Sequence, residues 1–469
     1  MQPLLHPDRL FSSCQTQRAI ARELYQSVCD LPIISPHGHT DPHWFADNKR
    51  FENATQLLIQ PDHYLLRMLF SQGISMDDLG IERSDGLTLN EDPERVWHCF
   101  AANYFLFRGT PTQLWMDHVF AEVFDIHTVL NEQTASDVYT EINRLLATPA
   151  FAPRALFERF NIEVIATTES PLDPLAAHQK LARDSWQGNV ITAFRPDPVI
   201  DPEYEDFSNN IEALAKLSGV ACDDFAGYLD ALRERRQYFI SMGATSSDHG
   251  HPSAFTADLD AAQCERLYQS ALAGDLCPAD AELFRGQMLL EMALMSLDDG
   301  LVMQIHPGVY RNHNPELFQH YGRDKGADLP LPGEFVRNLK PLLDRVGNNP
   351  DFTLILFTLD ETTYARELAP LAGHYPAVKL GPAWWFYDSP EGMQRYRQQV
   401  TETAGFYNTV GFNDDTRAFL SIPARHDVAR RIDCRFLAQW VAEHRLQINE
   451  AQELAHALSY SLAKQAYKL

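Results

Sequence analysis

Two histidines separated by a single glycine, His37 and His39, close the apolar run Leu31–His37 and have the spacing of a metal-binding pair. In an extended segment, residues i and i+2 point to the same side, so both imidazoles can converge on one ion. Zinc favours imidazole nitrogens at about 2.0–2.1 Å, with a carboxylate and water completing a catalytic site. We therefore expect one divalent metal ion, with zinc as the first choice and a third ligand from another segment.

The natural carboxylate ligand is Asp415, in the acidic pair that follows the apolar run Phe406–Phe412. If the chain folds as a closed barrel, the last strand lies beside the first and brings this aspartate to the histidine pair. The acidic pair could instead cap a helix that begins at Thr416. Asp414 can serve as the cap while Asp415 binds the ion.

Other candidate site residues have a structural interpretation as well as a chemical one. His306 follows an apolar run and is either a core histidine or a group facing the same mouth as the ion. His63 and Tyr64 offer an acid/base pair, or a capped helix with a half-buried tyrosine. Arg311 lies in a segment rich in hydrogen-bond donors, as recognition of a polyol or carboxylate requires. Trp385 belongs either to the core or to a floor for the apolar face of a sugar.

Eight short apolar runs alternate with helix-like stretches, and polar residues follow most of them. Such near-continuous runs are typical of parallel strands covered by helices, and eight of them predict a (β/α)₈ TIM-like barrel. A doubly wound open sheet is the alternative, but no G-x-G-x-x-G follows an early run. The runs are Leu31–His37, Ile162–Thr168, Val190–Arg195, Phe239–Ser246, Leu301–His306, Phe352–Thr358, Ala377–Trp385 and Phe406–Phe412.

The rest of the chain is predicted to be helical around this barrel. Residues 45–155 have many helical signals and lie between the first two strands, so we expect an insertion over the barrel mouth. Residues 424–442 and 448–463 have a 3.6-residue period and predict closing helices. We expect residues 1–469 to form a single domain.

Composition excludes several classes of function. The chain has 469 residues, 39 Lys+Arg against 64 Asp+Glu and a formal net charge of −25, which argues against nucleic-acid and membrane-surface partners. The seven cysteines are scattered, so neither a disulfide framework nor a thiolate zinc site is expected. We see no signal peptide, membrane span or nicotinamide fingerprint, and we expect a cytoplasmic enzyme without nicotinamide or flavin. Enzymes of this size are often symmetric homo-oligomers.

A barrel with H-x-H on the first strand and aspartate on the last resembles the amidohydrolase superfamily. Within it, the chain resembles the uronate isomerases along nearly its full length, including their long insertion after the first strand. The matching segments are Ser35–His39, Pro61–Tyr64, Thr167–Glu169, Phe194–Asp197, Ser247–His249, Gln304–Gly308, Arg311–Asn314, Trp384–Phe386 and Asp415–Ser421, followed by Arg425 and His426.

The chain departs from many hydrolases of that superfamily, which hold two metals through a histidine on strand six and a bridging group on strand four. Here strand six ends in Leu359-Asp360-Glu361 and strand four in Ser-Ser-Asp-His. The resemblance therefore implies a single metal and weakens a hydrolytic scheme. A metal-dependent hydrolase or lactonase acting on sugar acids is the alternative, and a non-catalytic sugar-acid binding protein is a more distant one.

The resemblance implies that the substrate is a hexuronate, with D-glucuronate and D-fructuronate, and D-galacturonate and D-tagaturonate, interconverted through an enediol. Arg195 would pair with the C6 carboxylate, because a guanidinium binds carboxylates in a bidentate manner. Tyr64, aided by His63, is the first candidate for acid/base work, with Asp415 as the competing base. Arg417 would stabilise the enediolate. His306, Arg311 and Trp385 would bind and position the sugar.

Overall fold

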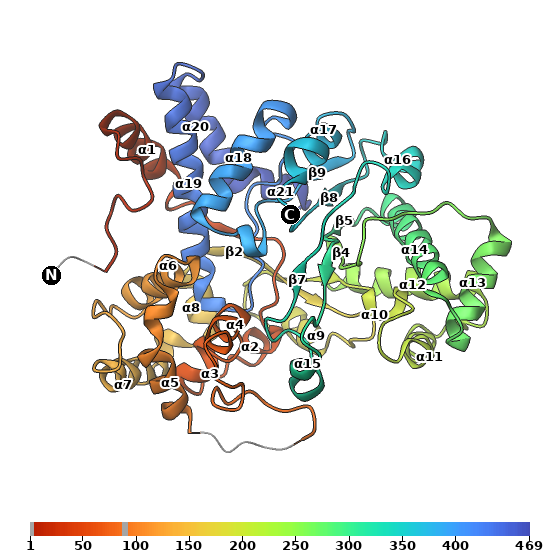
Figure 1. Cartoon of the computed structure of the whole chain (residues 1–469), viewed down its shortest axis with the longest axis horizontal. Coiled ribbons are helices and arrows are strands. Elements are labelled where there is room, and N and C mark those ends of the chain that lie inside the picture. The colour runs from red at the N-terminus through yellow and green to blue at the C-terminus, as the bar shows by residue number, and fades with distance from the viewer. Residues whose placement is uncertain (1–3, 87–91) are drawn as a thin grey trace.

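The structure is a computed structural model that describes residues 4–86 and 92–469, so residues 87–91 of the predicted insertion lie outside the described part. Its centre is a curled, parallel, seven-stranded sheet with the order β1-β2-β3-β4-β5-β8-β9 (Figure 1). A separate antiparallel pair, β6 and β7, follows β5. The strands are β1 Ile33–Ser35, β2 Ile162–Glu169, β3 Val190–Phe194, β4 Ser246–His249, β5 Val302–Ile305, β6 Val309–Tyr310, β7 Leu329–Pro330, β8 Leu354–Leu356 and β9 Val378–Leu380.

Helices surround this sheet and contain many more residues than the strands. They are α1 Gln15–Val28, α2 Pro42–Asp47, α3 Ala54–Leu58, α4 His63–Phe70, α5 Pro93–Ala102, α6 Pro111–His118, α7 Ala135–Leu146, α8 Pro153–Arg159, α9 Ala176–Ala182, α10 Asp197–Ile200, α11 Phe207–Ser218, α12 Phe225–Ser241, α13 Ala261–Ala273, α14 Pro278–Asp299, α15 Pro315–Tyr321, α16 Lys340–Val346, α17 Ala369–Ala372, α18 Pro390–Ala404, α19 Ile422–Ala442, α20 Ile448–His456 and α21 Leu462–Ala466. Short 3₁₀ or π turns are η1 Tyr104–Phe107, η2 Val119–Val123, η3 Pro149–Phe151, η4 Tyr364–Leu368, η5 Trp385–Tyr387, η6 Phe419–Ser421 and η7 Ala457–Ser461.

The strands are buried on both faces, which explains their continuous apolar runs. Met303 and Leu354 pack in the large core cluster that includes residues of the outer helix α14. Their neighbours Val302 and Ile355 point the other way and pack against Tyr467, just after α21. The last helical turn of the described chain thus fills the inner face of the curled sheet, near β8 and β9 in Figure 1.

The fourth predicted strand is wrong in its position. Residues 239–241 are the last residues of α12, which begins after the N-cap Asp224, and Gly243 turns the chain with a φ of +95°. The strand β4 follows as Ser246–His249, all four residues buried. It has no apolar signature because its polar side chains face the interior, where Asp248 has charged partners.

The eighth predicted strand is present only as an extended segment. Within Phe406–Phe412, Thr409 forms a single parallel bridge with Leu380 at the end of β9. Farther along, the backbone N–H of His39 donates to the carbonyl of Thr416 at 3.0 Å. The sheet is therefore a seven-stranded half-barrel, and a hydrogen bond from His39, just after β1, reaches the segment after β9.

The predicted helical segments have helical structure where they are described. Between β1 and β2 the described residues form helices and turns without a strand, and the division into an insertion and a barrel stays a prediction. The predicted closing helices at 424–442 and 448–463 correspond to α19, α20 and the start of α21. Across the described chain, no helix combines the length and apolar character that crossing a membrane would need.

Candidate metal and substrate site

A pocket of about 770 Å³ opens at the carboxyl ends of the parallel strands. The structure brings every residue singled out from the sequence to this pocket, from segments nearly 400 residues apart. Among the residues that line it are the ten candidates His37, His39, His63, Tyr64, Arg195, His306, Arg311, Trp385, Asp415 and Arg417. Their common location is established here, whereas their individual roles stay predictions.

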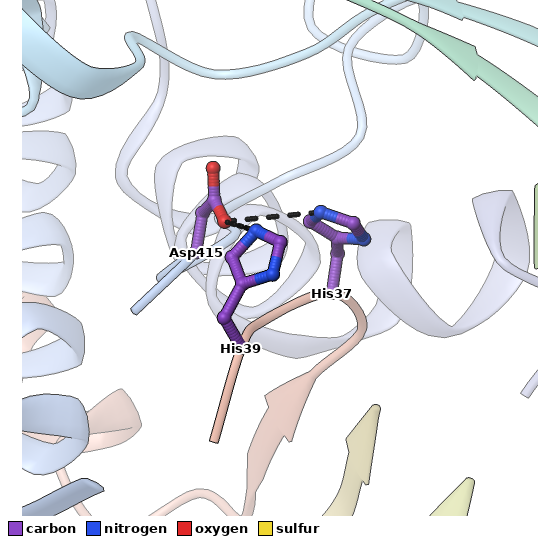
Figure 2. Close-up of side chains that lie close together, drawn as sticks. All are labelled: His37, His39 and Asp415. Carbon is purple, nitrogen blue, oxygen red and sulfur yellow. Dashed lines mark ion pairs between the residues drawn. The ribbon is translucent and has the colours of Figure 1, made fainter. Parts of the chain in front are cut away.

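His37, His39 and Asp415, hereafter the histidine–aspartate cluster, converge on one point (Figure 2). Oδ1 of Asp415 lies 3.2 Å from Nε2 of His39 and 3.8 Å from Nε2 of His37. Ligands about 2.0–2.1 Å from a tetrahedral ion lie about 3.3 Å apart, so this spacing suits one. Among the described residues, this is the one group of three such side chains close enough to hold an ion.

The hydrogen bonding of Asp415 leaves one oxygen for that ion. The indole N–H of Trp384 donates to Oδ2. Oδ1 is buried and has no hydrogen-bond partner in the described chain. Burial alone would raise the pKa of Asp415, but His39 and His37 hold it well below its usual range. Burial lowers the pKa of His39, and Asp415 offsets this only in part. A charged carboxylate beside a neutral imidazole is the state that a divalent ion requires, so these residues fit one.

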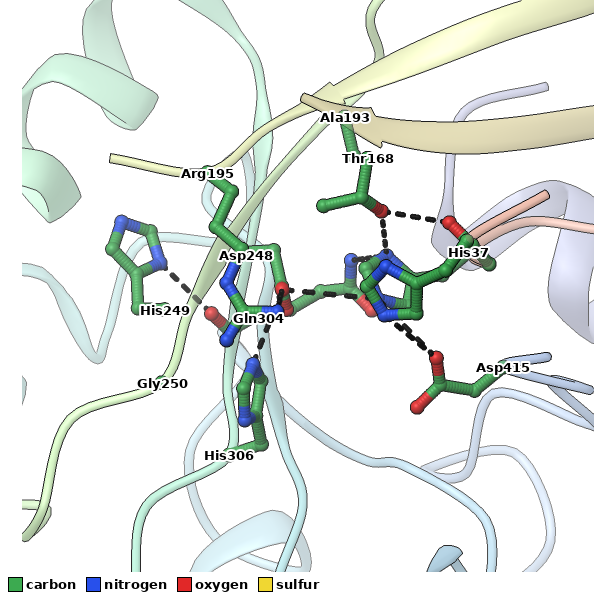
Figure 3. Close-up of polar contacts among 12 residues, drawn as sticks. His37, Thr168, Ala193, Arg195, Asp248, His249, Gly250, Gln304, His306 and Asp415 are labelled. Carbon is green, nitrogen blue, oxygen red and sulfur yellow. Dashed lines mark hydrogen bonds and ion pairs between the residues drawn. The ribbon is translucent and has the colours of Figure 1, made fainter. Parts of the chain in front are cut away.

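A second group, hereafter the arginine cluster, lies beside the first and consists of Arg195, Asp197, Asp248 and His306. Figure 3 shows Arg195, Asp248 and His306 of this cluster. Arg195 lies 3.0 Å from Asp197 through Nε and 3.6 Å from Asp248 through Nη1. Nε2 of His306 lies 3.1 Å from Oδ2 of Asp248. Burial would raise the pKa of Asp248, but His306, His37 and Arg195 hold it well below its usual range.

Gly250, directly after β4, leaves the space that the arginine cluster occupies. A Cβ atom at this position would lie 2.7 Å from Nη2 of Arg195 and 2.8 Å from Cε1 of His306. It would also lie 2.9 Å from Oδ2 of Asp197, which accepts from the N–H of Gly250. Any larger residue must therefore displace the guanidinium or the imidazole.

Helix α4 brings His63 and Tyr64 into the lining of the pocket. Asp62 caps it by accepting the N–H of Tyr64 at 2.8 Å. The two rings stack with centroids 4.5 Å apart. Burial lowers the pKa of His63 to about 3, and Nε2 of this ring has no hydrogen-bond partner in the described chain. Burial also raises the pKa of Tyr64 well above its usual value, only partly opposed by Arg425. At neutral pH the phenol is therefore a proton donor and the imidazole is uncharged.

The floor and rim of the pocket contain residues with unusual backbone conformations. Trp385 has a φ of +52° and Asp415 a φ of +37°, in the left-handed region that disfavours side chains. This conformation lets the consecutive residues Trp384 and Trp385 both line the pocket. Arg311 lies over the ring of Trp385, 5.4 Å from its centroid.

Three residues were missed when candidates were chosen from the sequence. Asp248 and Gln304 are adjacent on β4 and β5, and Glu169 ends β2. Each lies within a segment that matches the uronate isomerases. What could have identified each of them in the sequence is its position at the end of a strand, not its residue type. Burial raises the pKa of Glu169 to about 7. That value suits proton transfer near neutral pH.

The pocket is acidic despite its arginines. Eight carboxylate residues and five arginines line it. Each of these arginines already has a carboxylate partner: the pairs are Arg195–Asp197, Arg311–Asp328, Arg323–Glu205, Arg417–Asp324 and Arg425–Asp388. Two of the lining carboxylates, Asp201 and Glu203, share Arg285. An anionic ligand would therefore meet little unpaired positive charge unless a cation is bound.

Comparison with known proteins agrees with this arrangement. The family model described as glucuronate isomerase matches residues 9–467. A uronate isomerase of Xanthomonas axonopodis is 62% identical, covering 99% of this chain and 98% of the relative, and one of Sphingopyxis alaskensis is 63% identical over 99% of each chain. The crystal structure of glucuronate isomerase from Caulobacter crescentus superposes with a TM-score of 0.98 at 60% identity, covering 100% of this chain and 98% of that one. With the matched residues running through every segment that lines the pocket, the chain belongs to the glucuronate isomerase family.

Proposed function

We propose that the protein interconverts D-glucuronate with D-fructuronate, and D-galacturonate with D-tagaturonate. The observation that carries the proposal is the histidine–aspartate cluster next to the arginine cluster, in one pocket of a chain of this family. An aldose–ketose isomerisation opens the sugar ring and moves a proton between C2 and C1. It needs an acid, a base and a way to stabilise enediolate charge.

The residue roles follow from their protonation states. Tyr64, protonated at neutral pH, donates to the sugar during ring opening, with neutral His63 stacked against it. Tyr64 and Asp415 are the candidates for exchanging the C2 proton. Asp415 is ionised at neutral pH, whereas Tyr64 can take the C2 proton only after it has given its own proton to the ring oxygen during ring opening. Arg417 stabilises the enediolate and is held by Asp324 at 2.9 Å.

The remaining residues bind and orient the sugar. Arg195 pairs with the C6 carboxylate through guanidinium nitrogens that Asp197 leaves free. His306 and Arg311 supply further polar contacts. The face of Trp385 supports the apolar side of the sugar. Because all three lie on different segments after β5 and β9, they can fix both ends of an extended sugar.

A divalent ion, zinc in the first instance, would be held by His37, His39 and Asp415. When bound, it polarises sugar oxygens and offsets the negative charge of the pocket. We also propose that the protein works in the cytoplasm on a small-molecule hexuronate, that it can form homo-oligomers, and that residues 45–155 cover the pocket. No nicotinamide or flavin enters this scheme.

The test is a proton NMR time course of the purified protein with D-glucuronate in D₂O, repeated with D-galacturonate. We expect the ketose to appear with deuterium at C1, or deuterium to return to C2 of the aldose. The second candidate function, a metal-dependent hydrolase or lactonase acting on sugar acids, uses the same ion site. If neither uronate changes with zinc present and a sugar-acid lactone is opened, the isomerase proposal is wrong and the hydrolase is supported.

A further inference from the structure

Tyr467 is a buried tyrosine that the proposed reaction does not use. It follows α21, has no solvent exposure and packs against Val302 and Ile355 on the inner face of the sheet. Burial keeps its pKa well above the usual value for tyrosine, so the hydroxyl remains protonated. An apolar contact alone would be satisfied by phenylalanine. The hydroxyl therefore needs a separate explanation.

One arm of contacts leads from this hydroxyl to His37. Tyr467 donates to Oε1 of Gln304 at 2.7 Å, and both residues are fully buried. Nε2 of the same carboxamide lies 3.4 Å from Nδ1 of His37, and Figure 3 shows Gln304 beside that ring. An ion on Nε2 of His37 requires a proton on Nδ1 and therefore an acceptor facing it. The carboxamide supplies one when it is turned over, with Oε1 toward Nδ1 and Nε2 donating to Oη of Tyr467. Nε2 of His37, the atom that faces Asp415, is left free.

A second arm leads from the same hydroxyl to Asp415. Nδ2 of Asn413 donates to Oη of Tyr467 at 3.4 Å. Oδ1 of Asn413 accepts the backbone N–H of Asp415 at 3.1 Å. Asp415 has a left-handed backbone, and this bond contributes to holding it there. One hydroxyl thus touches two side chains, each of which fixes a different member of the histidine–aspartate cluster.

We propose that Tyr467 is a positioning residue for the ion site, holding His37 through Gln304 and Asp415 through Asn413. The inference rests on the ion site of the proposed function. It adds that Tyr467 sets the spacing of His37 and Asp415, two of the three proposed ligands. Groups hydrogen-bonded to metal-bound histidines fix ring orientation, and their loss typically weakens metal binding about 10–100-fold. Tyr467 acts one residue farther out, so we expect the lower end of this range.

The experiment compares zinc affinity in the metal-stripped full-length protein and in Tyr467→Phe, by competition with a chromophoric chelator. We expect the dissociation constant for zinc to rise about tenfold, with the thermal midpoint of the metal-free protein changing little. The matched control is Tyr460→Phe, which removes a hydroxyl bonded to Glu163 at 2.6 Å on the same stretch of chain. This control should bind zinc as the parent does.

A second variant guards against a folding defect. Tyr467→Phe combined with Gln304→Met removes both partners of the buried hydrogen bond, which costs less stability than stranding one. It should fold and still bind zinc at least tenfold more weakly. Parental zinc affinity in folded Tyr467→Phe would overturn the inference and leave the proposed function intact. A parent protein that fails to bind zinc would instead overturn the proposed ion site, and the inference with it.

Discussion

The histidine–aspartate cluster and the arginine cluster touch each other, yet only the second contains an arginine. Nε2 of His37 lies 3.8 Å from Asp415 in the first cluster and 3.7 Å from Asp248 in the second. The arginine cluster contains its own cation, so its carboxylates are paired within the protein. The histidine–aspartate cluster has no side-chain cation among its members and leaves Oδ1 of Asp415 without a hydrogen bond. The first cluster thus has a carboxylate and no cation, whereas the two carboxylates of the second share Arg195, and Asp248 also keeps one oxygen, Oδ1, without a hydrogen bond in the described chain.

The largest effect is expected for a substitution that disrupts only the histidine–aspartate cluster. Asp415→Asn keeps the shape of the side chain and an oxygen for the indole of Trp384, but removes the charge that an ion needs. We expect zinc affinity to fall more than about 100-fold, beyond the usual effect of an outer contact, and isomerase activity to fall with it. Metal content after dialysis and turnover measure both. Asp258→Asn, which loses only an exposed pair with Arg345, is the control. Full zinc binding by Asp415→Asn would remove this aspartate from the ligand set.

The next effect breaks the second cluster. Arg195→Ala removes the cation between Asp197 and Asp248 and should cost about 2–5 kcal/mol of uronate binding. Zinc affinity should change less than uronate affinity, although Asp248, which loses its arginine, lies 3.7 Å from Nε2 of His37. Titration calorimetry with substrate and with zinc separates the two effects, and Arg345→Ala serves as the control. Unchanged affinity for uronate would show that Arg195 does not bind the carboxylate.

A smaller effect concerns a carboxyl in neither cluster. The pKa of Glu169 is raised by burial from 4.5 to about 7, so between these values the folded protein holds a proton that the unfolded chain has released. This group therefore lowers the free energy of unfolding as the pH rises from about 4.5 to 7. In Glu169→Gln, the free energy of unfolding should therefore fall by up to about 3 kcal/mol less over this pH range than in the parent protein. Denaturant unfolding at pH 4.5 and pH 8 measures it.

Asp388, whose pKa burial also raises to about 7, contributes with the same sign and is untouched by the Glu169 variant. The parent and Glu169→Gln should thus both lose stability with rising pH, the variant by less. Parallel pH profiles for the two proteins would mean that Glu169 is ionised throughout this range. Glu169 would then resemble the carboxylates of the two clusters, which are ionised in this pH range.

The smallest effect compares two glycines, one beside each cluster. Gly250→Ala would place Cβ 2.7 Å from Arg195, whereas Gly38→Ala meets its nearest atom, the carbonyl of Thr416, at 3.4 Å. We expect Gly250→Ala to raise KM about tenfold by displacing the guanidinium, a cost near 1.4 kcal/mol. Gly38→Ala should keep both KM and zinc affinity within about twofold. Equal effects in the two variants would show that crowding of Arg195 does not limit binding.

How far the sequence predicts the fold depends on what each strand buries. Strand β8, Leu-Ile-Leu, is apolar on both faces and was predicted without difficulty. Strand β4, Ser-Ser-Asp-His, is equally buried but polar, and the apolar run before it belongs to the end of α12. The apolar residues at the end of this helix resemble a strand in sequence, which explains why the predicted strand begins too early. A strand whose partners are internal charges has no hydrophobic pattern for a sequence argument to find.

The residues of the site were easier to predict than the strands, because histidine, aspartate and arginine side chains can be recognised in the sequence as possible ligands and acid/base groups. His37, His39 and Asp415 stood out from spacing and from their place after strands. Asp248 did not, since its meaning depends on His306 and Arg195, which approach it only in three dimensions. The proposed role of Tyr467 is still harder to predict from the sequence. Nothing near it in the chain indicates that it touches the centre of the sheet.

The left-handed backbone of Trp385 has a consequence for how this protein can be engineered. A non-glycine residue in that region costs about 1–2 kcal/mol. Glycine at this position would relieve that strain, but it would lose the ring contacts with His63 and Phe386 and the aromatic surface against which Arg311 rests. Variants selected for heat resistance should accordingly be screened for turnover at every round, because a substitution at Trp385 changes both the stability of the protein and the surface of its pocket.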